Sequence, residues 1–134
     1  MMPTPQAILD TCVLVDILRG RKKNLAEKLR NLDIRRCVIT DLTRFELLCG
    51  AEESKNPEHN TQIVKELCNQ FKTLPCAYGM EYAAKEKVKL KREGRLIPDI
   101  DLLIGSISAS QEIPLVTGNV KHMERISGIQ IIPW

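Results

Sequence analysis

Carboxylate side chains interrupt strongly apolar sequence at three separate places in this 134-residue chain. Asp10 ends the run "AILD", Glu46 lies in "TRFELLCGA", and Asp101 lies in "IPDIDLLIG". Carboxylates that lie close together raise one another's pKa, so they tolerate proximity best when they share a cation. Oxygen ligands without a His or Cys cluster suit the hard ions Mg²⁺ or Mn²⁺. Such an ion activates water and neutralises phosphate charge, which predicts metal-dependent phosphodiester hydrolysis.

Each acid also has a local structural interpretation. Asp10 is placed to cap the helix that follows it, an effect of ~1 kcal/mol. Glu46 follows Thr43 by three residues, which is the spacing of a capping box. Asp99 and Asp101 both suit the positive end of a helix dipole. Residues two apart on a helix point to different faces, so we expect at most one of this pair to face the site. We prefer Asp101, because it starts the apolar run "DLLIGSISA", and keep Asp99 as a supporting residue.

Short apolar runs alternate with helical patterns along the chain. The patterns predict strands at 7–10, 37–40, 113–117 and 129–134, and helices at 12–20, 24–33, 41–54, 59–74, 78–94 and 98–111. Strands separated by helices indicate right-handed β-α-β units and a mostly parallel sheet. The predicted fold class is therefore α/β, with three layers α/β/α, in a single domain over residues 1–134.

Polar residues stand where this fold class places its sites. In open α/β sheets, sites form beyond the carboxyl ends of the strands. Asp10 and Thr11 end the first predicted strand, and Thr117 and Asn119 follow "PLV" in a later one. We therefore expect the supporting residues Thr11, Thr117 and Asn119 to lie at the same edge as the acids.

The bulk composition excludes several classes of protein. Hydrophobic residues make up 43% and charged residues 28%, which is typical of a globular domain. Apolar runs fall short of the ~20 residues of a membrane span, and "MMPTPQ" lacks the pattern of a secretory signal, so we expect a cytoplasmic protein. Five cysteines without a C-x-x-C spacing disfavour zinc and disulfide frameworks. Phosphate-binding glycine loops and a G-x-S-x-G elbow are absent.

The two histidines and two basic clusters leave alternatives open. We expect His59 on the surface, and His122 in a surface or structural role, with an approach to the site as the alternative. The clusters "RGRKKN" and "KEKVKLKREGR" are interpreted either as solvated helix faces or as phosphate-facing patches, since the net charge of +3 decides neither.

Four segments together give the chain a family resemblance. They are "ILDTCVLVDILRG", "ITDLTRFELLCGA", "GRLIPDIDLLIGSISAS" and "PLVTGNVKHMERISGIQIIPW". In this order and spacing they resemble a PIN-domain ribonuclease of the VapC toxin type, from end to end. The resemblance implies a Mg²⁺- or Mn²⁺-dependent endoribonuclease with about five parallel strands. It maps metal ligands to Asp10, Glu46 and Asp101, a lesser role to Asp99, and orienting roles to Thr11, Thr117 and Asn119.

The resemblance also implies partners. The substrate class is structured RNA, with tRNA favoured, and its backbone would be gathered by Arg19, Arg21, Lys22, Lys89 and Arg92. A cognate antitoxin would wrap the chain and place a basic side chain among the acids, and a homodimer is expected. The segments "FELLCGAEES" and "TQIVKELCNQF" are candidate contact surfaces, with ordinary core as the alternative.

One departure from the family matters for the metal. Many PIN domains carry a fourth acid at or just after the position of Asn119, whereas this chain has Asn119-Val120-Lys121-His122. That replacement argues against a permanent second metal site. It also leaves open an alternative function, in which the chain is a non-catalytic PIN-fold module that binds RNA or docks a protein. A phosphohydrolase acting on small phosphates is a more distant alternative.

Overall fold

The computed structural model describes residues 4–20 and 23–134. Within these residues five strands form one sheet in the order β3-β2-β1-β4-β5, and every neighbouring pair is parallel. Ile8 of the central strand pairs with Val38 on one side and Leu115 on the other. The predicted parallel sheet of about five strands is confirmed. The strands are β1 Ala7–Leu9, β2 Cys37–Thr40, β3 Lys72–Leu74, β4 Leu115–Thr117 and β5 Ile131–Pro133.

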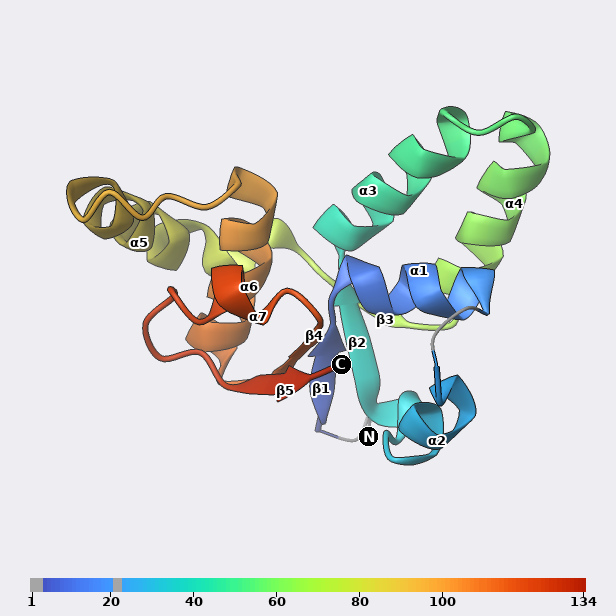
Figure 1. Ribbon diagram of the computed structural model, residues 1–134, viewed down its shortest axis with the longest axis horizontal. Coiled ribbons are helices and arrows are strands. Elements are labelled where there is room, and N and C mark those ends of the chain that lie inside the picture. The colour runs from blue at the N-terminus through green and yellow to red at the C-terminus, as the bar shows by residue number, and fades with distance from the viewer. Residues whose placement is uncertain (1–3, 21–22) are drawn as a thin grey trace.

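Helices cover both faces of this sheet (Figure 1). Within the described ranges they are α1 Thr11–Arg19, α2 Leu25–Arg30, α3 Asp41–Glu52, α4 Pro57–Cys68, α5 Met80–Arg92, α6 Asp99–Gln111 and α7 Val120–Met123. Two short 3₁₀ helices, η1 Ile34–Arg36 and η2 Cys76–Gly79, complete the connections. None of these helices is both long and apolar enough to cross a membrane.

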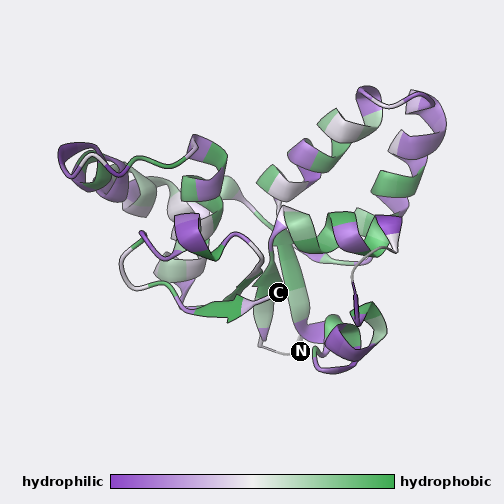
Figure 2. Ribbon diagram, in the orientation of Figure 1, coloured by the Kyte–Doolittle hydropathy of each residue, from purple (hydrophilic) through white to green (hydrophobic). Residues whose placement is uncertain are grey.

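The alternation of side chains along the strands divides the core into two layers. Ile8, Val38 and Leu115 point to one face and pack with α5 and α6. Leu9 and Ile39 point to the other face and pack with α1, α3 and α4. Helices cover both faces of the sheet, and the residues in the central part of the strands are accordingly hydrophobic (Figure 2). The predicted three-layer α/β/α arrangement is confirmed.

One predicted element is wrong in its extent. We expected a single helix over 59–74, but α4 ends at Cys68 with Asn69 as its C-cap. The chain then turns and forms β3, in which Thr73 pairs with Ile39 of β2. Pairing with β2 gives these backbone groups hydrogen-bond partners that a longer helix would have provided, and the β-branched Thr73 suits a strand. The fifth strand of the sheet comes from this segment.

Candidate active site

Asp10 lies directly beyond the carboxyl end of the central strand and is only 4% exposed. Its Oδ1 accepts a hydrogen bond from the backbone N–H of Thr11 at 2.8 Å, which makes Asp10 the N-cap of α1. Its Oδ2 accepts a hydrogen bond from the Thr117 hydroxyl at 2.7 Å. The local interpretation as a cap is therefore confirmed, and the same carboxylate also belongs to the polar cluster at the sheet edge.

Burial raises the pKa of Asp10, and this is the largest influence on it. The hydrogen bonds from Thr117 and from the Thr11 backbone act in the opposite direction, because they stabilise the ionised form. The negative charges of Asp101 and Glu46 raise the pKa further, since they disfavour a third charge nearby. The ionised Asp10 is thus held at a free-energy cost that a cation at this edge would relieve.

Glu46 lies in the second turn of α3, and its position is fixed by a residue of α1. The Thr11 hydroxyl donates to Glu46 Oε1 at 2.6 Å and also hydrogen-bonds with the buried Thr43 hydroxyl at 3.0 Å. The capping-box interpretation of Glu46 is wrong. The N-cap of α3 is Thr40, whose hydroxyl accepts from the Thr43 backbone N–H, so Glu46 is too far along the helix to cap it.

Asp101 lies in the first turn of α6, where its carboxylate meets two side chains that follow β4. Asn119 Nδ2 donates to Asp101 Oδ2 at 3.0 Å, and His122 Nδ1 lies 3.1 Å from the same oxygen. The Asn119 backbone N–H donates to Thr117 Oγ1 at 2.9 Å. Since Thr117 also donates to Asp10, one chain of hydrogen bonds runs from Asp10 to Asp101.

The structure therefore brings together six of the residues predicted for the site: Asp10, Thr11, Glu46, Asp101, Thr117 and Asn119. They come from the junction of β1 and α1, from α3 and α6, and from the end of β4 and the segment after it, so they lie at the carboxyl ends of β1 and β4. Sequence reasoning gave too little weight to His122 and did not find Thr43. The signal for His122 was available, because it follows Asn119 by three residues and so shares a helix face with it.

Asp99 does not join this cluster. Its carboxylate forms an ion pair with Lys87 of α5 at 2.9 Å, and its side chain is 65% exposed. Since it precedes Asp101 by two residues on α6, it points to another face of that helix. The assignment of Asp99 as a supporting site residue is corrected accordingly.

The predicted RNA-contacting residues do not form one patch. Arg21 and Lys22 lie outside the described residues. Arg19 ends α1, whereas Lys89 and Arg92 lie on α5, and these two helices stand on opposite sides of the sheet (Figure 1). The Lys89 ammonium group donates a hydrogen bond to the Ser127 hydroxyl and lies 3.9 Å from the Glu86 carboxylate, so it already has partners within the chain. His59, in contrast, is exposed on α4, as predicted.

The donor chemistry of the cluster fits a hard divalent cation. Its acids would offer carboxylate oxygens to an ion, and these are ligands that Mg²⁺ and Mn²⁺ prefer. Among the described residues, however, no group of three or more His, Cys, Asp or Glu side chains is gathered closely enough to hold an ion. Binding would therefore have to draw the carboxylates together, and the partly exposed Glu46 and Asp101 have more room to move than the buried Asp10.

A groove of about 350 Å³ opens beside Glu46 and Thr11. Its walls are contributed by α1, α3 and α4, and we call it the α1–α4 groove. Apolar side chains dominate it, and two of them, Leu18 and Ile63, are partly exposed. Its lining comprises Thr11, Val15, Leu18, Arg19, Glu46, Leu47, Gly50, Ala51, Ser54, Asn60, Ile63 and Val64.

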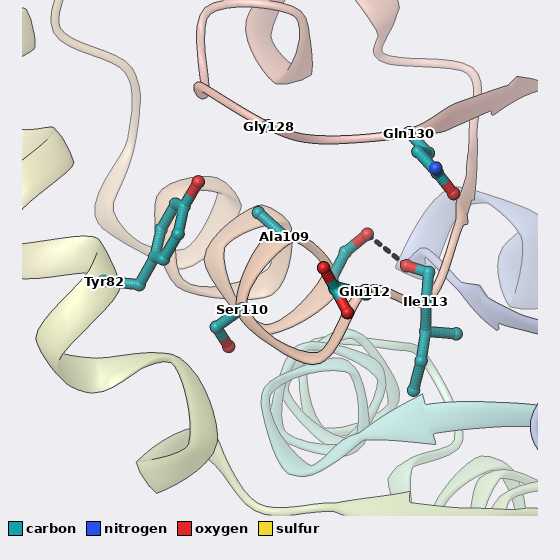
Figure 3. A pocket seen from close by; sticks show the side chains of 8 residues that line it. Tyr82, Ala109, Ser110, Glu112, Ile113, Gly128 and Gln130 are labelled. Carbon is teal, nitrogen blue, oxygen red and sulfur yellow. Dashed lines mark hydrogen bonds between the residues drawn. The ribbon is translucent and has the colours of Figure 1, made fainter.

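A larger hollow of about 660 Å³ lies away from the acids, beside the segments that lead into β4 and β5. Tyr82 and Gln130 stand on opposite sides of it (Figure 3). The Tyr82 hydroxyl donates to the Ser127 carbonyl, and burial raises the pKa of this tyrosine. The lining holds one acid, Glu112, and no basic side chain, so it offers no catalytic group comparable to the acidic cluster.

The structure is an α/β domain with a cluster of acidic and polar side chains at the carboxyl edge of a parallel sheet. Comparison with known families agrees with this fold. The family model described as "PIN domain" matches residues 7–129, so the chain belongs to the PIN-domain family. Within that family it is of the VapC toxin type, as the individual relatives indicate.

Ribonuclease VapC1 of Haemophilus influenzae (strain R2866) is 31% identical over 129 residues, covering 95% of this chain and 96% of the relative. The tRNA(fMet)-specific endonuclease VapC of Salmonella typhimurium is 28% identical, with the same coverage. Among solved structures, DNA-bound VapBC from Salmonella typhimurium matches with a TM-score of 0.88 and 27% identity. That match covers 98% of this chain and 99% of the other.

Proposed function

We propose that this chain is a metal-dependent endoribonuclease, the toxin of a toxin–antitoxin pair. The observation that carries the proposal is that Asp10, Glu46 and Asp101 belong to one hydrogen-bonded network at the edge of the sheet. A network built only to stabilise the fold would gain little from a buried carboxylate whose pKa is raised by burial and by two further acids. The names of the relatives as ribonucleases support RNA as the substrate class.

The proposed reaction is hydrolysis of an RNA phosphodiester, in which a water oxygen bonds to phosphorus while a P–O bond to ribose breaks. A bound Mg²⁺ or Mn²⁺ supplies water of lowered pKa and neutralises phosphate charge. Thr117 and the Thr11 backbone N–H hold Asp10 in place, and the Thr11 hydroxyl aims Glu46. Asn119 orients Asp101, so each carboxylate has a partner that fixes its direction.

Replacing Thr11 with valine tests this positioning. The variant keeps the shape of the side chain but removes the hydroxyl that donates to Glu46 at 2.6 Å. We expect kcat for RNA cleavage to fall by about 10–100-fold, because Glu46 is no longer held in one direction. A matched control is Thr61→Val on α4, whose hydroxyl lies 3.4 Å from exposed Glu52 and should leave kcat unchanged. A Thr11→Val enzyme as fast as the wild type would remove Thr11 from the site.

We propose tRNA as the preferred substrate, on the strength of the Salmonella typhimurium relative that is named for tRNA(fMet). Arg19 at the end of α1, which lines the same groove as Glu46, would contact the RNA backbone, and this makes binding weaker at high salt. The direct test is sequencing of RNA ends after induced expression of the chain. New ends confined to a few tRNAs support the proposal, while ends scattered over messenger RNA would redirect it to another RNA.

We propose that the α1–α4 groove receives a helix of the antitoxin. Its apolar walls suit the apolar face of an amphipathic helix, and its end at Thr11 and Glu46 brings a following basic side chain to the acids. Ile63, which lines the groove and is 37% exposed, is the best probe. Ile63→Asp should weaken antitoxin binding by at least about tenfold while leaving RNA cleavage unchanged.

The control for that variant is His59→Ala, which lies on the same helix but outside the lining. Binding is measured with the cognate antitoxin by calorimetry, and cleavage with purified tRNA. Full antitoxin affinity in Ile63→Asp would place the partner elsewhere. The segments "FELLCGAEES" and "TQIVKELCNQF" also contribute to the core of this chain, since Leu47, Ala51 and Val64 are buried there. Only their exposed side chains are therefore available to a partner.

A homodimer is also proposed, with α3 as a candidate contact because Phe45 is 57% exposed there. Light scattering at micromolar concentration measures the mass, and a monomer would contradict the proposed homodimer.

The competing function is a non-catalytic module that binds RNA or docks a protein. Mn²⁺ titration distinguishes it from the nuclease, because the non-catalytic module predicts no bound ion.

A further inference from the structure

The hollow of about 660 Å³ lies at the opposite edge of the sheet from the acidic cluster. It is found at the amino ends of β4 and β5, between α5 and the last turn of α6. Its volume is in the range of sites that hold a small molecule. Its eight lining residues include three hydroxyl side chains, one carboxylate and one amide, and none of the eight is basic.

The three hydroxyl groups in this lining already use their hydrogens within the chain. The Tyr82 hydroxyl donates to a backbone carbonyl in the loop after α7. The Ser108 hydroxyl donates to the Ile113 carbonyl at 2.5 Å, and the Ser110 hydroxyl donates to a backbone carbonyl of η2 at 2.8 Å. A hydroxyl has one hydrogen, and a carbonyl oxygen can only accept. Toward a ligand, each of these hydroxyl oxygens can therefore act only as an acceptor.

Glu112 adds a negative charge where the helix already carries one. It is the C-cap of α6, at the negative end of the helix dipole, and the last turn of α6 has no basic residue. Its backbone has a φ of 55°, a region in which glycine or asparagine is usual at a helix end. Within the described part of the chain, no basic side chain forms an ion pair with its carboxylate. The stability of α6 therefore does not explain a glutamate at this position.

The carboxylate lies among the acceptors of the lining. Figure 3 shows the Glu112 side chain between Tyr82 and Gln130, which stand on opposite sides of the hollow. Among the eight lining side chains, Gln130 alone can donate a hydrogen bond to a ligand as well as accept one. The hollow is thus rich in acceptors, carries a negative charge and is poor in donors.

We propose that this hollow binds a guanidinium group, either of an arginine side chain or of a small guanidine compound. A guanidinium has five N–H donors, no acceptor and a permanent positive charge, so it complements this lining. Glu112 would accept two N–H groups in a bidentate pair, and the hydroxyl oxygens of Tyr82 and Ser110 would accept others. The hollow lies away from the acidic cluster, so the inference does not depend on the proposed nuclease function.

The test uses two probes that differ only in their head group. Agmatine carries a guanidinium, and N-carbamoylputrescine carries a neutral urea in its place. Calorimetry on the full chain should give a Kd of about 1 mM or below for agmatine. The urea compound should bind at least about tenfold more weakly, because it has lost the charge and has an acceptor in place of one donor.

Glu112→Gln should weaken agmatine binding by at least about tenfold, because it removes the charge while keeping the length of the side chain. The matched control is Glu58→Gln, which makes the same change of charge at an exposed position on α4, outside the lining. It should leave agmatine binding unchanged. Gln130→Lys, a second variant, brings an ammonium group into the lining that pairs with Glu112, and it should abolish agmatine binding.

The peptide acetyl-Gly-Arg-Gly-amide distinguishes the two sources of the guanidinium. Tighter binding of the peptide than of agmatine supports an arginine residue of a protein partner, and weaker binding supports a small guanidine compound. Equal affinity for agmatine and its urea analogue overturns the inference, as does full agmatine affinity in Glu112→Gln. A wild-type chain that binds neither agmatine nor the peptide at about 10 mM overturns it as well.

Discussion

Asp10→Asn should abolish RNA cleavage and, in the same molecule, raise thermal stability. Cleavage is expected to fall by at least about 10³-fold, because the buried carboxylate at the centre of the proposed cation site is lost. Stability should rise by about 1 kcal/mol, or about 3–5 °C in Tm, because the asparagine avoids a buried charge. The amide can still accept from the Thr11 backbone N–H, so the N-cap of α1 survives.

The pH dependence of this gain has a definite sign. The pKa of Asp10 is raised in the folded chain, chiefly by burial, so the folded state holds its proton more tightly than the unfolded state. The wild type therefore loses stability as pH rises from the unfolded value of 3.8 through the raised folded pKa, and the loss persists above it. The advantage of Asp10→Asn should be full once the pH exceeds the raised folded pKa, and it should disappear as the pH falls below about 4.

Thermal unfolding with a chelator present, at several pH values between 4 and 8, measures this directly. The control is Asp99→Asn, which removes an exposed carboxylate paired with Lys87 and should leave both cleavage and Tm nearly unchanged. An Asp10→Asn chain that is less stable at neutral pH, or that still cleaves RNA, contradicts the assignment of Asp10 as a strained ligand.

Gly79→Ala should be the most destabilising small substitution at the interface between η2 and α6. A Cβ at this position would lie 2.6 Å from the backbone nitrogen of Ile107 and 3.0 Å from its Cα. Backbone atoms in a buried helix cannot move aside as a flexible side chain can, so the contact must be relieved by shifting α6. We expect a loss of about 2–4 kcal/mol, which lowers Tm by roughly 10 °C.

Gly50→Ala is the matched control for that substitution. Gly50 lies within α3, and a Cβ there meets nothing within 4 Å. Alanine should stabilise the helix by about 0.5–1 kcal/mol, since it restricts the unfolded chain and favours helix. Chemical denaturation of both variants gives the free energies of unfolding. Equal effects of the two substitutions would mean that η2 and α6 are not in close contact at Gly79.

Sequence patterns predicted the fold well where burial was continuous. The runs at 7–10, 37–40 and 113–117 have no polar residue before their ends, and both faces of each are covered in the sheet. The edge strand β3 escaped prediction because "KTL" continues the helical pattern of α4, and its pairing with β2 depends on contacts distant in sequence. Local periodicity carries no information about such a partner.

The acids of the site were predictable, but their connections were not. Asp10, Glu46 and Asp101 stand out because each interrupts apolar sequence, and the fold class then brings strand ends to one edge. Which partner each acid takes depends on the packing of helices that are distant in sequence. The bond from Thr11 to Glu46 joins α1 and α3, and the contact of His122 with Asp101 joins α7 and α6. Spacing along the chain indicated that Asp99 and Asp101 face different sides of the helix, but it could not show that Asp99 forms an ion pair with Lys87.

The most direct test of the central claim is a titration of Mn²⁺ into the wild type and into Asp10→Asn, Glu46→Gln and Asp101→Asn, with bound ion counted by electron paramagnetic resonance. If the three carboxylates share one cation, the wild type binds it and each single variant loses about 100-fold or more in affinity. If the wild type binds no Mn²⁺, or if all three variants retain its affinity, the acids do not hold a common ion.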